Sequence, residues 1–294
     1  MTILKNIGKT PVVKLENPNG DGYAQVYLNM EEFNPGGSIK SRVGFQMIND
    51  AEANGLIKKG DTLIEATGGN TGVGLAIASS IKGYNLILVV PDNYSEKKIG
   101  MLKEYGAKVV LADHNLGNDC HIQVAEQLMK EHPDYINLNQ FKNDSNPKAH
   151  YLYTAEEILK QVDKKIDVFV SVIGSGGTIT GVSRKLKEKN ENIKIVGVQP
   201  KGCDIINNKY IRHKIQAIAV GKVGSFFDKS LIDDMADVTF EEVQEVRKYL
   251  SEKQGLFVGL SAGANISAAF RESKKYDSSK VIVTMAPDGG ISYL

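Results

Sequence analysis

The stretch DTLIEATGGNTGVGLAIASSIKGYNLILVVP, residues 61–91, decides the fold class of this chain. The apolar run at 61–66 predicts a strand, the segment 70–83 predicts a helix with a face of small residues, and the run at 85–91 predicts a second strand. A strand, a helix and a strand in this order form a right-handed unit with parallel strands. The sequence therefore predicts an α/β protein.

The same alternation continues on both sides of this stretch. Further strands are predicted at 107–112, 167–173, 194–200 and 280–287, and further helices at 95–106, 147–163, 240–253, 262–274 and from about Thr178. A chain of 294 residues exceeds what one core usually supports, and no Pro/Ser-rich linker divides it. We therefore expect two interleaved α/β lobes, each with a mostly parallel sheet flanked by helices.

Composition limits the partners and the compartment. Lysine and arginine number 36 against 35 aspartates and glutamates, so no nucleic-acid partner is expected. The two cysteines, Cys120 and Cys203, form no CxxC pair, and Cys120 and its neighbour His121 point in different directions on a helix, so no disulfide framework and no metal site is expected. The sequence lacks a signal-like N-terminus and a run of 18 apolar residues, which predicts a cytoplasmic protein without a membrane anchor.

Glycine-rich loops follow three of the predicted strands, where ligands bind in parallel sheets. The loop GSGGTITG, 174–181, leads into a helix, and its backbone N–H groups can surround a phosphate, although a tight turn without a ligand is the alternative. It has neither the GK[ST] ending of a nucleotide loop nor a dinucleotide fingerprint. A phosphate outside a nucleotide is the better prediction.

The other two loops are ambiguous alone. EATGGNTG, 65–72, offers backbone donors and hydroxyls for a carboxylate, or a plain capping turn. In GLSAGAN, 259–265, Ser261 is either a ligand or a helix cap. NPGGSIKSR, 34–42, places Lys40 at a helix start, where the helix dipole disfavours a positive charge, although most lysines are simply solvated. A lysine amine, a phosphate loop, a carboxylate loop and an isolated serine together are what pyridoxal phosphate and an amino acid require.

The order and spelling of seven segments resemble one family. These are IGKTPVV, NPGGSIKSR, TGGNTG, QFKNDSNPKAHY, GSGGTITG, GLSAGA and PDGGISYL, which run from about Ile7 to the C-terminus. They are similar to those of the cysteine synthase (O-acetylserine sulfhydrylase) and cystathionine β-synthase family of fold-type II pyridoxal-phosphate enzymes, whose fold is tryptophan synthase β-like with the cofactor in the cleft. The resemblance implies pyridoxal 5′-phosphate as cofactor and a homodimer.

The resemblance also implies the site residues. Lys40 carries the cofactor as a Schiff base and acts as general base, Asn70 binds the ring oxygen, and Ser261 partners the pyridine nitrogen. The phosphate loop maps on Gly174, Ser175, Gly176, Gly177 and Thr178, and the substrate carboxylate on Thr67, Gly68, Thr71 and Gln140. A small, mobile substrate-carboxylate lobe is expected at 41–145, and a large phosphate-binding lobe at 1–40 and 146–294.

The implied reaction is β-replacement on a small amino acid. Loss of the β-group gives an α-aminoacrylate on the cofactor, to which sulfide or a thiol adds. The main prediction is a cysteine synthase, which forms cysteine from O-acetylserine and sulfide. The alternative is a cysteine-consuming enzyme of the cysteine lyase or lanthionine synthase type, which releases hydrogen sulfide.

Three departures from the family pattern concern the substrate. Gly68 stands where the family has serine, Ser41 where aspartate is common, and GKVGSFF, 221–227, where GIGAGF normally lies beside the leaving group. A serine at 68 would project toward the β-substituent, so Gly68 predicts a wider pocket and an acceptor larger than sulfide, unless the glycine is neutral.

Three other function classes fit the sequence less well. A serine/threonine dehydratase would carry SFKxRG at the lysine and a run of glycines at the phosphate, and an oxidoreductase would carry a dinucleotide fingerprint. A non-catalytic interaction protein on the same fold would not need Lys40 and Asn70.

Overall fold

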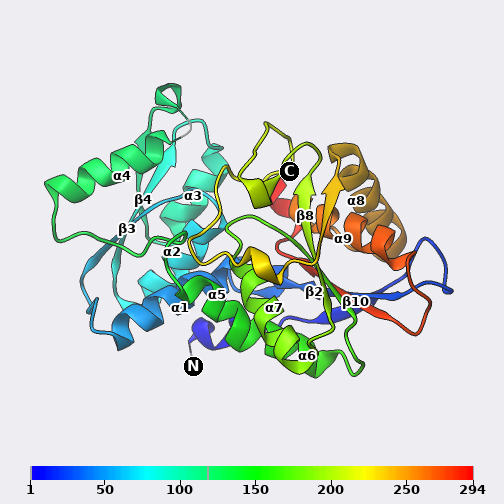
Figure 1. The fold of residues 1–294 in the computed structure, drawn as a ribbon. Coiled ribbons are helices and arrows are strands. Elements are labelled where there is room, and N and C mark those ends of the chain that lie inside the picture. Colours follow the sequence, from blue (N-terminus) through cyan, green and yellow to red (C-terminus); the bar gives the residue numbers. More distant parts are fainter. Residues whose placement is uncertain (1, 118, 294) are drawn as a thin grey trace.

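The computed structural model describes residues 2–117 and 119–293, and they form two sheets with helices packed around each (Figure 1). Residues 1, 118 and 294, which fall within the two predicted lobes, lie outside the described residues. The two sheets confirm the α/β fold class with parallel-dominated sheets. None of the described helices has the length and apolarity needed to cross a membrane.

The larger sheet has six strands in the order β1-β2-β10-β7-β8-β9. The β1 strand pairs antiparallel with β2, and every other neighbouring pair is parallel. The central strands β10 and β7 are almost fully buried, as expected for parallel strands covered by helices on both faces. The strands are β1 (Val12–Leu15), β2 (Gln25–Met30), β7 (Val168–Val172), β8 (Lys194–Pro200), β9 (Asp234–Val238) and β10 (Val281–Ala286).

The smaller sheet has four parallel strands in the order β5-β4-β3-β6. It is the left-hand sheet in Figure 1, and all of its residues come from one continuous part of the chain. The predicted boundaries of the two lobes, at residues 41 and 145, and the mobility of the smaller one stay predictions. The strands are β3 (Thr62–Ala66), β4 (Asn85–Pro91), β5 (Lys108–Ala112) and β6 (Ile136–Asn137).

The helices cover the faces of the two sheets, with α1 to α4 around the smaller sheet and α8 and α9 beside the larger one (Figure 1). They are α1 (Lys40–Ala53), α2 (Asn70–Lys82), α3 (Glu96–Glu104), α4 (Cys120–Glu131), α5 (Ser145–Ala149), α6 (Ala155–Gln161), α7 (Gly177–Lys189), α8 (Phe240–Gln254) and α9 (Leu260–Ser273).

The close packing of α1 on α2 depends on two glycines. A Cβ on Gly44 would lie 2.6 Å from the backbone of Gly74, and a Cβ on Gly74 would lie 2.4 Å from the carbonyl oxygen of Lys40. Neither contact leaves room for a side chain, so the two helix backbones touch. This contact fixes the first residue of α1, Lys40, beside the first turn of α2.

The single helix predicted at 147–163 is wrong in its details. The helical segment begins at Ser145, whose backbone N–H donates to Oδ1 of Asn143 at 3.0 Å, and it contains a wider π-helical turn at His150–Thr154. A Cβ on Gly181 of α7 would lie 2.1 Å from the carbonyl oxygen of Pro147, so α7 crosses this segment at backbone contact. Single π turns of this kind are frequent near functional sites.

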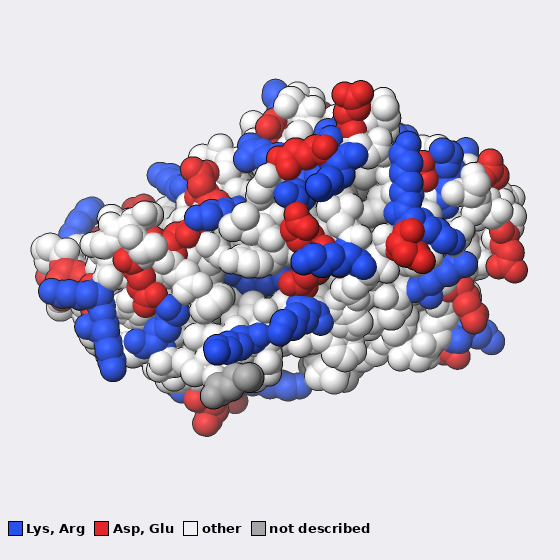
Figure 2. Space-filling model, turned by 90° about the horizontal axis from the view of Figure 1, so that it is seen from below, with Lys and Arg blue, Asp and Glu red and all other residues white. Residues whose placement is uncertain are grey.

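The surface carries charges of both signs in close mixture. On the face shown in Figure 2, lysine and arginine side chains alternate with aspartates and glutamates, and neither sign forms a continuous stripe. This distribution agrees with the net charge of +1.

Candidate active site

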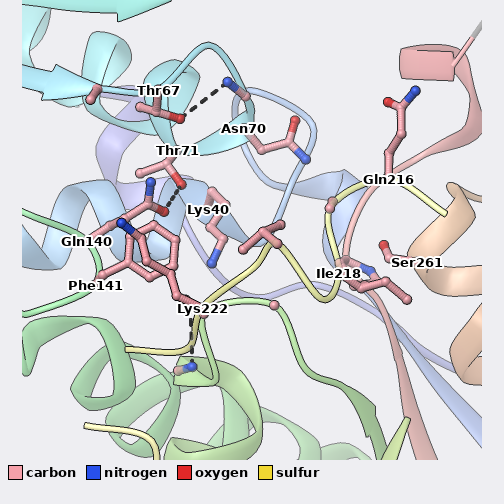
Figure 3. A pocket seen from close by; sticks show the side chains of 18 of the residues that line it. Lys40, Thr67, Asn70, Thr71, Gln140, Phe141, Gln216, Ile218, Lys222 and Ser261 are labelled. Atoms are coloured by element: carbon pink, nitrogen blue, oxygen red, sulfur yellow. Dashed lines mark hydrogen bonds between the residues drawn. The ribbon is translucent and has the colours of Figure 1, made fainter. Parts of the chain in front are cut away.

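A cavity of about 920 Å³ lies between the two sheets, at the carboxyl ends of β3 and β7 (Figure 3). It brings together eleven of the twelve residues predicted for the site. They are Lys40, Thr67, Asn70, Thr71, Gln140, Gly174, Ser175, Gly176, Gly177, Thr178 and Ser261. Gly68 is buried directly behind the cavity wall and does not line it.

Lys40 is the first residue of α1 and lies on the cavity wall. The preceding turn needs its glycines, because Gly36 and Gly37 have φ angles of 85° and 73°. Although the cavity gives some access to the Lys40 side chain, protein atoms surround it, and this burial lowers its pKa to about 8. Its amine is therefore much closer to neutral at physiological pH than that of an ordinary lysine.

A buried ion cluster holds the start of α1 in place. The guanidinium of Arg42 donates from Nε to Glu31 at 2.6 Å and from a terminal nitrogen to Glu157 at 2.8 Å. The Thr10 hydroxyl also accepts from Arg42, at 3.0 Å. A buried arginine with both carboxylates in bidentate reach is geometrically fixed, so the helix start that carries Lys40 is tied to three distant segments.

The glycine loop, residues 174–178, joins β7 to the first turn of α7. Gly176 has a φ of 88°, and a Cβ on Gly177 would lie 2.1 Å from Oδ1 of Asn146, so neither position accepts a side chain in this conformation. The Thr178 hydroxyl lies 3.3 Å from Nε2 of His150, whose pKa is well below its usual value because of burial and the charges of Lys40 and Arg42. The loop thus presents backbone N–H groups and a hydroxyl at a helix N-terminus, an arrangement suited to phosphate.

Ser261 lies in the first turn of α9, on the opposite side of the cavity from Thr67 and Gln140 in Figure 3. Its hydroxyl is buried and has no hydrogen-bond partner among the described residues. An unpaired buried hydroxyl costs free energy unless a ligand or water satisfies it. This oxygen is therefore available to a ligand atom in the cavity.

Asn70 begins α2 and is held by the C-terminal part of the chain. Its Nδ2 donates to Oδ2 of Asp288 at 2.7 Å, and the same carboxylate oxygen accepts from the Tyr293 hydroxyl at 2.8 Å. Burial raises the pKa of Asp288, although these two hydrogen bonds oppose the rise. The second N–H of the Asn70 amide remains free to contact a ligand.

Thr71 and Gln140 lie side by side at the carboxyl ends of the neighbouring strands β3 and β6. The Thr71 hydroxyl donates to Oε1 of Gln140 at 2.6 Å, as the dashed line in Figure 3 shows. The Glu65 carboxylate accepts from the backbone N–H of Asn139 at 3.0 Å and of Gln140 at 3.1 Å. Burial raises the pKa of Glu65 to about 7, against the lowering effect of these two bonds. Glu65 therefore fixes the loop that presents Gln140 to the cavity.

The wider pocket predicted from Gly68 is wrong. A Cβ on Gly68 would lie 2.5 Å from Cγ1 of Val90 and 2.9 Å from the ring of Tyr94. The absent side chain therefore leaves no free volume, because Tyr94 packs against the glycine and itself lines the cavity. A role for Gly68 through its backbone N–H stays a prediction.

The segment predicted to lie beside the leaving group is displaced in the sequence. Of residues 221–227 only Lys222 lines the cavity, whereas all of 216–220 do. Ala217 and Ala219 have φ angles of 67° and 46°, a conformation that favours glycine. The backbone conformation thus indicates that residues 217–221, and not 221–227, correspond to the family segment GIGAGF.

Several cavity residues had not been predicted. Asp288 lines the cavity and the buried Asn146 packs behind the glycine loop; both lie within segments that carried the family resemblance, and their contacts appear only in three dimensions. Tyr94, Asp119 and His121 come from loops and from the start of α4, a helix the periodicity had not indicated. Cys120 and His121 do diverge as expected, because Cys120 is buried in the core and His121 faces the cavity.

The arrangement fits a phosphorylated ring aldehyde such as pyridoxal phosphate. The glycine loop provides donors for a phosphate, the Ser261 hydroxyl at the cavity wall is unpaired among the described residues and so available to a ring atom, and Lys40 offers an amine of lowered pKa. These features come from three separate elements and converge on one cavity.

Comparisons with known proteins agree with this arrangement. A family model described as "Pyridoxal-phosphate dependent enzyme" matches residues 3–288. A cystathionine beta-synthase from Apis mellifera is 40% identical over 302 residues, which cover 99% of this chain and 60% of that protein. A cysteine synthase from Staphylococcus aureus is 37% identical, with 99% of this chain and 94% of that protein covered.

Solved structures give the same result. A hydrogen sulfide-producing enzyme from Fusobacterium nucleatum superposes with a TM-score of 0.94 at 39% identity, covering 100% of this chain and 97% of that one. The chain thus spans nearly the full length of the bacterial relatives and about three fifths of the cystathionine beta-synthase.

Proposed function

This chain belongs to the family of pyridoxal-phosphate-dependent enzymes, and we propose that it catalyses β-replacement on a small amino acid in the manner of a cysteine synthase. The donor under this proposal is O-acetylserine and the acceptor is sulfide or a thiol. The observation that carries the proposal is the meeting of Lys40, the glycine loop and the unpaired Ser261 hydroxyl in one cavity.

Bound pyridoxal phosphate supplies an aldehyde that condenses with amines and a ring that withdraws electrons from the α-carbon of an amino acid. Backbone N–H groups of the glycine loop and the hydroxyl of Thr178 hold its phosphate. The Asn70 amide, oriented by its hydrogen bond to Asp288, would contact the ring oxygen. Ser261 would offer one neutral hydrogen bond at the ring nitrogen, which suits loss of a β-substituent better than a carboxylate that keeps the nitrogen protonated.

Lys40 moves the proton at the substrate α-carbon. A general base works best when its pKa is near the working pH, and burial brings Lys40 to about 8. The neutral amine of Lys40 would remove the α-proton of the bound donor and return a proton when the product is formed. No carboxylate among the described residues lies within ion-pair distance of Lys40, so its charge is not stabilised by a fixed partner.

The donor carboxylate binds at the start of α2. Thr67 and Thr71 present hydroxyls there, and Gln140 presents its amide from the loop after the neighbouring strand β6. Glu65 keeps Gln140 in position through two backbone hydrogen bonds. Closure of the smaller lobe, residues 41–145, over this site would exclude water, which otherwise destroys the reactive product of β-elimination.

The family resemblance also underlies the oligomeric state and the location that we propose. We propose a homodimer in the cytoplasm that acts on small amino acids without a nucleic-acid or membrane partner.

A product panel tests the proposed function. O-acetylserine, cysteine and serine are each combined with sulfide, cysteine or homocysteine, and products are identified by mass. Formation of cysteine from O-acetylserine and sulfide supports the proposal. Formation of only pyruvate and ammonia from every donor would overturn it in favour of a dehydratase.

Cysteine consumption is the second candidate, and similarity to a hydrogen sulfide-producing enzyme favours it. In the same panel, cysteine alone would then release hydrogen sulfide and yield lanthionine. A parent enzyme that makes cysteine and never consumes it would exclude this candidate.

A further inference from the structure

Charged side chains surround the outer part of the cavity, where the proposed cofactor and donor residues do not reach. Asp119, His121 and Glu126 come from α4 and the residue before it, and Lys222 comes from the loop before β9. We call these four the mouth residues. They come from two elements that both line the cavity, with Asp119 and Lys222 both close enough to His121 to affect its charge, and the proposed donor site uses none of them.

Lys222 is an exposed cation held at the edge of the donor site. Its Nζ lies 4.9 Å from the centroid of the Phe141 ring, and Phe141 follows Gln140 directly (Figure 3). The aromatic face holds the ammonium group by a cation–π contact, which leaves its hydrogen-bond donors free. Among the described residues no carboxylate pairs with it. Its charge is therefore available to an anionic ligand group.

His121 stands across from Lys222 with an unsatisfied ring nitrogen. Its Nδ1 is buried and has no partner within the described part of the chain. Burial lowers the His121 pKa, while the nearby Asp119 raises it and Lys222 lowers it. The ring is thus predominantly neutral at neutral pH, with one nitrogen to donate and one to accept a hydrogen bond.

Binding of sulfide does not require such a set of charged and polar groups. It carries neither a carboxylate nor an ammonium, and the donor carboxylate is already served by Thr71 and Gln140. A cation on one side of the mouth and an acidic side chain on the other instead match the two charges of an amino-acid zwitterion. Charge complementarity of this kind selects a ligand by opposing poorly matched ones.

We propose that the mouth residues bind an amino-acid thiol as the acceptor, with Lys222 at its carboxylate, Asp119 at its ammonium and His121 hydrogen-bonded to it. This inference rests on the proposed β-replacement and specifies its second substrate. The reaction forms one C–S bond at the donor β-carbon. With O-acetylserine the β-carbon–oxygen bond breaks, and the products are the thioether, acetate and the proton of the thiol. With cysteine as donor the β-carbon–sulfur bond breaks, and the thiol proton leaves within hydrogen sulfide.

Four thiols test the contributions of the acceptor carboxylate and the acceptor ammonium one at a time. Cysteine carries both, 3-mercaptopropionate carries only the carboxylate, cysteamine only the ammonium, and 2-mercaptoethanol neither. With O-acetylserine as donor, kcat/KM for each thiol is measured from product mass and divided by the value for 2-mercaptoethanol. In the parent enzyme we expect cysteine to exceed 2-mercaptoethanol by at least a hundredfold.

Two variants should change this selectivity in opposite ways. Lys222→Met should lower the ratios for cysteine and 3-mercaptopropionate at least tenfold and leave the ratio for cysteamine within twofold. Asp119→Asn should lower the ratios for cysteine and cysteamine instead. Lys229→Met removes an exposed lysine of the same segment that does not line the cavity, and it should change no ratio.

The outcomes distinguish the acceptor site from the proposed function. Equal use of all four thiols by the parent, or equal changes of all ratios in Lys222→Met, would overturn the acceptor site while β-replacement with sulfide stands. If no thiol and no sulfide replaces the acetyl group, the proposed function fails, and the acceptor site fails with it. Lys222→Glu gives an independent check, because it should reverse the preference between 3-mercaptopropionate and cysteamine.

Discussion

The glycine loop and the mouth residues are two sides of one cavity built in opposite ways. The glycine loop is made of backbone, and its geometry depends on positions where no side chain fits, such as Gly177 against the buried Asn146. The mouth residues are three exposed charged side chains and the half-buried His121, and they come together only through the fold. The cofactor side should therefore be sensitive to added volume, and the acceptor side to changed charge.

The largest expected effect comes from removing the Lys40 amine, which lies in the cavity that the glycine loop and the mouth residues share. Lys40→Ala should lower β-replacement at least a thousandfold, because it removes both the cofactor linkage and the general base. Initial rates of product formation measure this, and thermal unfolding checks that the variant is folded. Turnover within tenfold of the parent would contradict the role of Lys40.

Added volume in the glycine loop should come next. Gly177→Ala should raise the dissociation constant for pyridoxal phosphate about 10- to 100-fold, because overpacking of this kind costs roughly 1–3 kcal/mol. Asn146 cannot easily give way, since its Nδ2 also donates to the carbonyl oxygen of Gln140 at 2.9 Å. Equilibrium titration by absorbance measures the affinity.

Gly100→Ala is the matched control for that variant. Gly100 lies in α3, and a Cβ there would meet no heavy atom within 4 Å. Its affinity for the cofactor should equal that of the parent. Equal losses in both variants would mean that Gly177 acts through general stability.

The pH dependence of cofactor loading tests the burial of Lys40. Only the neutral amine attacks the aldehyde, and the cofactor-free protein has a Lys40 pKa of about 8. The loading rate at subsaturating cofactor should therefore rise about tenfold from pH 6 to pH 7 and level off above pH 8. Stopped-flow absorbance measures it, and a rate that keeps rising tenfold per unit beyond pH 9 would indicate an ordinary solvated lysine.

The same shift affects stability in a defined direction. The folded-state pKa of Lys40 lies below the unfolded value, so the unfolded chain binds more protons between about pH 8 and pH 10.5. The contribution of Lys40 to stability therefore increases with pH through that window.

The smallest effect is expected behind the cavity wall. Gly68→Ala should destabilise the protein by about 1–3 kcal/mol, because its Cβ would overlap Val90 and Tyr94. Gly69→Ala is the matched control, since a Cβ there would lie 4.0 Å from its nearest neighbour. Denaturant unfolding compares the two. If Gly68→Ala instead left stability unchanged and increased selectivity against large acceptors, the pocket-widening interpretation of Gly68 would be restored.

The sequence predicted the buried parallel strands well because they are continuous apolar runs. The strands β4 and β8 were predicted with their observed bounds. The strands β1, β2 and β9 were missed, since all three mix polar with apolar residues, and β1 and β9 also lie at the two edges of the larger sheet. The amphipathic helix α4 was also missed.

The site residues also divide into those that the sequence predicted and those that it did not. Backbone loops such as TGGNTG and GSGGTITG are local in sequence, so their positions in the cavity could be predicted. The contact of Asn70 with Asp288 joins residues 218 positions apart, and the mouth residues meet across two elements, so no local pattern could reveal them. Gly68 shows how a residue-type argument fails when the direction of the missing side chain is unknown.

Chemical mapping of the cofactor linkage tests the central claim most directly. The purified protein is loaded with pyridoxal phosphate, reduced with borohydride, digested, and analysed by peptide mass spectrometry, with Lys40→Ala treated in parallel. The account predicts one stoichiometric pyridoxyl adduct on the peptide that contains Lys40, and none in the variant. An adduct on another lysine, or a parent protein that forms no specific adduct, would contradict it.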